Sequence, residues 1–161
     1  MEYRIDTNGR IVEVSSDWDA FAVNNDGEQA MQSKVSGKPV IGFIKDDPTR
    51  MWFDTLVMHV RVKGGALERE YRCDSPTHRR YMRMKLVPEG SDIVVRHELV
   101  RVEPRQRPVV YFADEEGVEC CSVCHRLRLD EWEEPDDVLS PDQEELGVCF
   151  SVCGGCLKSL P

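Results

Sequence analysis

The stretch LEREYRCDSPTHRRYMRMKLVPEGSDIVVRHELVR, residues 67–101, decides the fold of the first part of this chain. It contains three candidate strand segments, over roughly 67–73, 79–87 and 93–101, of which the last two are rich in aliphatic residues. Clusters of turn-forming Asp, Ser, Pro and Gly residues separate the runs. The stretch therefore predicts three consecutive β-strands.

Upstream of this stretch, the sequence predicts a hairpin and then helices. Asn8-Gly9 lies between two short apolar runs and is a strong hairpin signal, because both residues tolerate positive φ. Ser16 or Asp17 can cap a short helix that ends near Val23. We expect residues 24–44 to form short helices and loops.

A longer helix is predicted between residues 46 and 63. Asp46-Asp47-Pro48 supplies an acidic cap and a proline in the first turn, and Lys63-Gly64-Gly65 ends the helix. The order is strands, helices and strands again, which is typical of an α+β fold. We expect one antiparallel sheet of five strands with helices covering one of its faces.

Two C-x-x-C pairs near the C-terminus, Cys121 with Cys124 and Cys153 with Cys156, have the spacing of a metal site. The 28 residues between the pairs allow two knuckles to enclose one tetrahedral Zn²⁺ ion. Four protein ligands leave no open coordination position, so this ion would stabilise the fold without catalysis. We expect Trp132 to build a small core there with four aliphatic side chains, those of Leu127, Leu129, Val138 and Leu139.

Other chemistry fits parts of the same pattern. Cys121-Ser122-Val123-Cys124-His125 matches a c-type haem attachment sequence, in which the histidine ligates iron, but haem would leave the second pair without a role. Without haem, we expect His125 to be solvated. The same four thiolates can hold iron or an iron–sulfur cluster, or act as redox dithiols. Cys120 and Cys149 lie close to the proposed ligands and are expected to be free thiols.

Charge is distributed unevenly along the chain. Residues 1–110 carry 18 Lys and Arg against 17 Asp and Glu, whereas residues 111–161 carry 3 against 13. Zinc-bound thiolates add further negative charge, and an acidic surface repels phosphate backbones. We therefore expect no nucleic acid partner.

Two further clusters are candidate sites. Strand alternation places Met82 and Met84 on one strand face, and Val95 and His97 on a face of the next strand, where they would line a ligand pocket or simply form core. His97 would hydrogen-bond a ligand or bind haem iron there. A second group surrounds one turn and consists of Arg72, Asp74, Arg79 and Arg80. Asp74 would cap the turn or pair with Arg79 or Arg80. Alternatively, the arginines would bind an anion.

The chain also resembles a known family. The early motifs Tyr3-Arg4-Ile5-Asp6, Gly9-Arg10-Ile11, Trp18 and Ser36-Gly37-Lys38-Pro39 resemble a PAS-type sensor domain. The stretch from Tyr71 to Pro76, with Arg79-Arg80, is similar to a subgroup of PAS-like bacterial proteins. The cysteine-rich tail resembles a short zinc-ribbon-like module that follows sensor domains in bacterial signalling proteins. The resemblance implies a PAS-like domain at 1–103, a linker or extra strand at 104–112, and a zinc-binding module at 113–161.

Composition bounds the remaining possibilities. The chain is 40% hydrophobic and 32% charged, which is typical of a soluble globular protein. It contains no apolar run near the about 20 residues of a membrane span, and its N-terminus lacks the features of a signal peptide. We expect a cytoplasmic protein with reduced cysteines and no membrane association.

These observations favour a sensory or protein-interaction module of bacterial signal transduction with a structural zinc ion. Its partner would be a signalling protein, with a small-molecule ligand in the pocket, and the family resemblance implies that a homodimer can form. One alternative is a redox or haem-iron sensor that uses the cysteines or His97. Another is a small enzyme of unknown reaction, although no catalytic motif occurs and we expect no enzyme activity.

Overall fold

The structure is a computed structural model that describes residues 1–23, 27–140 and 142–161. The chain forms two compact units, which are described separately. Unit 1 comprises residues 1–45, 53–69 and 83–98, and unit 2 comprises 46–52, 70–82 and 99–161. Residues 70–82 and 99–112 thus belong to the same unit as the cysteine-rich segment. Residues 24–26, part of the expected loop region, lie outside the described residues.

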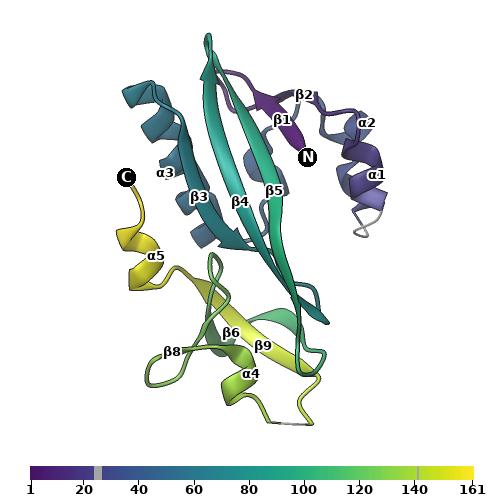
Figure 1. Cartoon of the computed structure of the whole chain (residues 1–161), viewed down its shortest axis with the longest axis vertical. Helices are drawn as coiled ribbons and strands as arrows, with labels where there is room; N and C mark the ends of the chain where they lie inside the picture. Colours follow the sequence, from purple (N-terminus) through teal and green to yellow (C-terminus); the bar gives the residue numbers. More distant parts are fainter. Residues whose placement is uncertain (24–26, 141) are drawn as a thin grey trace. The chain divides into compact units, whose positions relative to one another are not determined.

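The first elements follow the predicted order of strands, helices and strands (Figure 1). In chain order they are β1 (Glu2–Ile5), β2 (Ile11–Val14), α1 (Trp18–Val23), η1 (Glu28–Ala30), α2 (Gln32–Val35), η2 (Val40–Phe43), α3 (Asp47–Lys63), β3 (Leu67–Arg72), β4 (His78–Glu89) and β5 (Asp92–Pro104). The strands make a five-stranded antiparallel sheet in the order β2-β1-β5-β4-β3. The expectation of a mixed α+β fold with such a sheet is confirmed.

Local sequence signals account for the first hairpin. Gly9 has a φ of 71°, and the carboxylate of Asp6 accepts hydrogen bonds from the backbone N–H groups of Asn8 and Arg10 at 2.8 Å each. In the resulting register, Tyr3 of β1 lies opposite Val14 of β2 on one side and Val95 of β5 on the other. The hairpin predicted from Asn8-Gly9 is confirmed.

The predicted limits of the long helix α3 are also confirmed. The carboxylate of Asp46 accepts a hydrogen bond from the backbone N–H of Thr49 at 2.8 Å, which satisfies a free donor of the first turn. Gly64 ends the helix with a φ of 74°, a conformation that costs glycine little. Apolar side chains of both the helix and the strands are fully buried in unit 1, namely Ile5, Leu56, Val60, Leu86 and Val95. Within the described ranges, no helix combines the length and apolarity needed to span a bilayer.

Unit 2 contains a second sheet that the sequence did not predict. Its elements are β6 (Val110–Cys121), β7 (Leu127–Arg128), β8 (Trp132–Glu133), α4 (Pro135–Val138), β9 (Glu145–Ser151) and α5 (Gly154–Lys158). The sheet has four strands in the order β8-β7-β6-β9, and β6 and β9 run side by side and parallel (Figure 1). Residues 109–112, expected to add a strand, contain the start of β6.

The pairing of β6 and β9 is interrupted once. Ala113 and Val118 of β6 both lie opposite Val148, so residues 114–117 form an irregularity in the strand. Backbones approach closely at this point, because a Cβ atom on Gly117 would lie 2.5 Å from the backbone of Gly147. Glycine is therefore required at position 117 to keep the two strands together.

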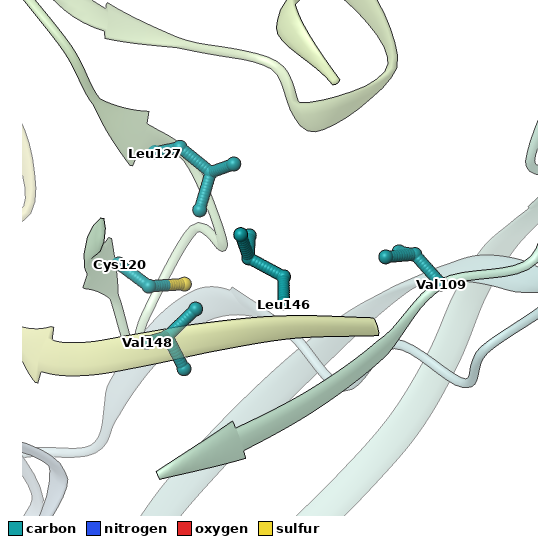
Figure 2. Close-up of a cluster of buried hydrophobic side chains, with 5 residues drawn as sticks. All are labelled: Val109, Cys120, Leu127, Leu146 and Val148. Atoms are coloured by element: carbon teal, nitrogen blue, oxygen red, sulfur yellow. The ribbon is translucent and has the colours of Figure 1, made fainter. Parts of the chain in front are cut away.

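The core of unit 2 lies on this second sheet. Cys120 of β6, Leu127 of β7, and Leu146 and Val148 of β9 point toward one another, and Val109 lies at one side of the group (Figure 2). The expectation of a core around Trp132 is partly wrong. Leu127, Val138 and Leu139 do belong to the cluster, but Leu129 is 53% exposed and Trp132 is not among its members.

Candidate metal centre

The four cysteines of the two C-x-x-C pairs lie together in unit 2. Their sulfur atoms are all within 4.8 Å of one another. Cys121 is the last residue of β6 and Cys124 lies in the turn that follows, while Cys153 caps the N-terminus of α5 and Cys156 lies within that helix. The parallel pairing of β6 and β9 brings the two pairs together, because each pair follows the same end of its strand. The four residues therefore can hold a metal ion.

Distances between the sulfur atoms fit tetrahedral coordination. The Sγ atoms of Cys124 and Cys153 are 3.8 Å apart. Thiolates about 2.3 Å from a central ion at the corners of a tetrahedron are separated by about 3.8 Å. Cys121 and Cys153 are buried, and Cys124 and Cys156 are partly exposed. Two of the four candidate ligands are therefore shielded from water, and two are partly accessible to it.

Backbone N–H groups hydrogen-bond to the sulfur atoms of this site. The N–H of Cys153 donates to Sγ of Cys121 at 3.3 Å, and the N–H of Cys156 donates to Sγ of Cys153 at 3.4 Å. Hydrogen bonds among the sulfur atoms lower the pKa of Cys121 and raise the pKa values of Cys124 and Cys156. Since metal ligation requires thiolates, the backbone N–H that donates to Sγ of Cys121 favours the ligand form of this residue.

The first pair lies in a tight backbone turn. The N–H of His125 donates to the carbonyl of Cys121 at 2.8 Å, and the N–H of Cys121 donates to the carbonyl of Arg126 at 2.9 Å. His125 has a φ of 58°, in the left-handed region that non-glycine residues seldom adopt. This conformation reverses the chain immediately after Cys124.

His125 is not the solvated residue that the sequence suggested. Its side chain is 18% exposed, and its Nδ1 atom lies 3.7 Å from a carboxylate oxygen of Asp74. Burial lowers the pKa of His125. The expectation was wrong because the sequence does not reveal that residues 70–82 lie against this turn.

Beside the turn lies a network of buried charged side chains. Asp74 pairs with both Arg72 and Arg105, the latter at 2.8 Å, and Arg79 pairs with Asp136 at 2.6 Å. The carboxylate of Asp74 also accepts a hydrogen bond from the backbone N–H of Arg80 at 3.1 Å. Arg72, Asp74 and Arg79 thus have charged partners, and two of these partners, Arg105 and Asp136, were not identified from the sequence.

Arg72 connects this network to the cysteine turn. Its guanidinium donates to the carbonyl of Cys124 at 3.0 Å and to the carboxylate of Glu134 at 2.7 Å. Although burial acts to lower it, the hydrogen bond and negative charge of Asp74 raise the pKa of Arg72. Arg72 is therefore permanently charged and supports the metal site from outside the ligand set.

The four residues expected to line a pocket have different environments. In unit 1, Met84 and Val95 are core residues with 2% and 0% exposure, and His97 stacks on Tyr3 with ring centroids 5.6 Å apart. His97 also lines an open depression of about 390 Å³ whose other lining residues are mostly charged. Met82, in unit 2, is 7% exposed.

The other cysteines differ from the four in environment. Cys120 is completely buried in the core of unit 2, and burial raises its pKa to about 12, so its thiol is unreactive. Cys149 and Cys73 are exposed. Neither Cys120 nor Cys149 forms a disulfide with any described residue.

The donor set indicates which metals fit. Soft thiolates in a tetrahedral arrangement suit zinc and iron, whereas magnesium and calcium prefer oxygen ligands. A scan against protein-family models and a search of the curated proteins each find no match to this chain. Evidence on function therefore comes from the geometry of this site.

Proposed function

We propose that this protein is a sensory or protein-interaction module of signal transduction whose C-terminal segment holds a structural zinc ion. The observation that carries the zinc part is the convergence of four sulfur atoms within 4.8 Å. Two of these cysteines are buried, and backbone N–H groups donate to two of the sulfur atoms. With four protein ligands, zinc would supply folding energy and no catalysis.

The sensory part rests on the first half of the chain. Its order of two strands, several helices and three strands is the order that a PAS-like domain implies. Exposed acidic residues in the last fifty residues of the chain, which include Asp114, Glu115 and Glu116, support docking on a protein rather than on nucleic acid. Neither observation supports an enzyme, and we propose a non-catalytic role.

Elemental analysis of the purified full chain tests the zinc proposal. We expect one zinc ion per chain, and loss of this zinc in Cys124→Ser and Cys156→Ser. Cys149→Ser is the matched control, because Cys149 is an exposed cysteine of the same unit that lies outside the quartet. Iron with visible absorbance would instead support the redox alternative, and protein without any metal would refute the proposal.

The sensory proposal needs its own experiment. Native mass spectrometry of the full chain would detect a retained small molecule, and crosslinking in cells would detect a specific protein partner. We expect at least one of these. If the native protein has neither a ligand nor a specific partner, the sensory and interaction roles are wrong, whatever the metal content.

A further inference from the structure

The two halves of the candidate metal site are held in different ways. The turn that carries the first pair is fixed by residues far away in the sequence. The backbone N–H of Arg72 donates to the carbonyl of Val123 at 2.8 Å, and the side chain of Arg72 donates to the carbonyl of Cys124 at 3.0 Å. Both carbonyls lie within the first C-x-x-C pair, so one arginine holds this turn through two hydrogen bonds.

Arg72 is itself held rigidly. Its side chain is 5% exposed and pairs with Asp74 and Glu134. Glu134 also accepts a hydrogen bond from Arg126 at 3.2 Å, which closes a ring of contacts around the turn. None of these contacts involves the sulfur atoms, so they do not depend on a bound metal.

The second pair lies in a segment, residues 152–161, of which little is buried. The last anchor of β9 to the first turn is the hydrogen bond from the N–H of Ser122 to the carbonyl of Ser151 at 2.8 Å. Cys153 and Cys156 follow on α5, a helix of five residues with no buried residue among them. An isolated helix of this length is unstable in water. The described contacts of the second pair with the first involve sulfur atoms: the N–H of Cys153 donates to Sγ of Cys121, and Sγ of Cys153 lies 3.8 Å from Sγ of Cys124.

We propose that Arg72 is a positioning residue that presets the first ligand pair, and that metal binding then orders the C-terminal segment 152–161 on this preset half. The proposal rests on the proposed metal site. It adds that the site forms in two steps, and that loss of the metal releases the C-terminal segment while the turn at 121–126 stays in place. α5 would thus be a metal-dependent structural element on an otherwise stable unit.

Zinc affinity of an Arg72→Lys variant tests the role of Arg72. A lysine keeps the charge but has a single nitrogen, which cannot reach Asp74, Glu134 and the carbonyl of Cys124 together. We expect Zn²⁺ affinity, measured in competition with a chromophoric chelator, to fall by about 10- to 100-fold, as for other residues that orient metal ligands. Arg128→Lys is the matched control, because Arg128 is 56% exposed and pairs with Glu119 of the same unit. This control should retain wild-type affinity.

Two further measurements distinguish positioning from a general loss of stability. In Co²⁺-loaded protein, Arg72→Lys should shift the visible ligand-field bands, whereas Arg128→Lys should leave them unchanged. In wild-type protein, zinc removal should abolish hydrogen-exchange protection in residues 152–161 and preserve it in 121–126. The exchange experiment uses wild-type protein, so it tests the two-step formation of the site even if Arg72→Lys does not fold.

The outcomes separate this inference from the proposed function. If wild-type protein binds no Zn²⁺, the metal site itself is wrong. If zinc binds but Arg72→Lys retains wild-type affinity and spectrum, Arg72 has no positioning role. Loss of protection at 121–126 together with 152–161 would refute the two-step site.

Discussion

Arg105 donates to the carboxylate of Asp74 at 2.8 Å, and both side chains are almost completely buried, with 1% and 3% exposure. Arg72 pairs with the same carboxylate. One aspartate therefore compensates two buried guanidinium groups, one at the end of β3 and one directly after β5. This relationship makes Asp74 the residue on which the charged network of unit 2 depends.

Substitution of Asp74 by Asn should destabilise the protein strongly. The amide removes the negative charge and leaves Arg72 and Arg105 buried without full compensation. Breaking a buried ion pair in this way costs about 3 to 5 kcal/mol. The free energy of unfolding from urea denaturation, followed by circular dichroism, would measure the loss.

Asp47→Asn is the control for this prediction. Asp47 pairs with Arg50 on the surface, and its side chain is 90% exposed. Exposed pairs contribute at most about 1 kcal/mol. Equal effects of the two substitutions would contradict the central role of Asp74.

Core packing in unit 2 predicts different effects for two nearby leucines. Leu127→Ala removes a side chain that is 1% exposed within the cluster on the second sheet and should cost about 2 to 5 kcal/mol. Leu129→Ala removes a side chain that is 53% exposed and should change stability by less than about 0.5 kcal/mol. Thermal unfolding of both variants is the measurement. A larger loss from Leu129→Ala would mean that the core is built differently.

Close contact between β6 and β9 predicts that Gly117→Ala is destabilising. The added methyl group would lie 2.5 Å from the backbone of Gly147, so one strand must shift. Overpacking of this kind costs about 1 to 3 kcal/mol. Gly42→Ala is a suitable control, because nothing lies within 4 Å of its new methyl group. Denaturant midpoints that do not differ between the two variants would contradict the described strand pairing.

His97 predicts a specific pH dependence of stability. Burial, and secondarily the charge of the N-terminal amine, lower its pKa from 6.5 to about 4. Because the unfolded chain binds the proton more readily, stability should fall as the pH decreases from about 6.5 to about 4, by about 1 to 3 kcal/mol in total. His97→Phe should retain the stacking on Tyr3 and lose this contribution. The difference between the unfolding free energies of the two proteins should therefore change between about pH 6.5 and about pH 4, and a constant difference would contradict the prediction.

Local signals made much of the fold predictable. The hairpin at Asn8-Gly9 and the limits of α3 depend on residues within a few positions of one another, and so do the two turns that separate β3, β4 and β5. The four cysteines were recognisable because C-x-x-C spacing is set by the ligand geometry itself. In each case the chemistry that fixes the structure lies within one short segment.

The rest depended on contacts between distant segments. Arg105 lies in a proline-broken basic stretch that the sequence assigned to a linker, and only the pairing with Asp74 reveals its role. The parallel pairing of β6 with β9 has no turn signal, since the strands are joined by a long crossover. His125 likewise becomes a partly buried residue beside Asp74, which lies fifty-one positions earlier in the chain.

The parallel arrangement of β6 and β9 also has a kinetic consequence. Strands that are close in sequence, such as β7 and β8, can pair early during folding. The β6–β9 ladder joins strands that a long segment of the chain separates, so it forms more slowly. Assembly of this sheet should be the slow step of refolding. Until it is complete, the apolar run from Leu146 to Val152 is exposed to self-association, so rapid dilution at low protein concentration should improve recovery.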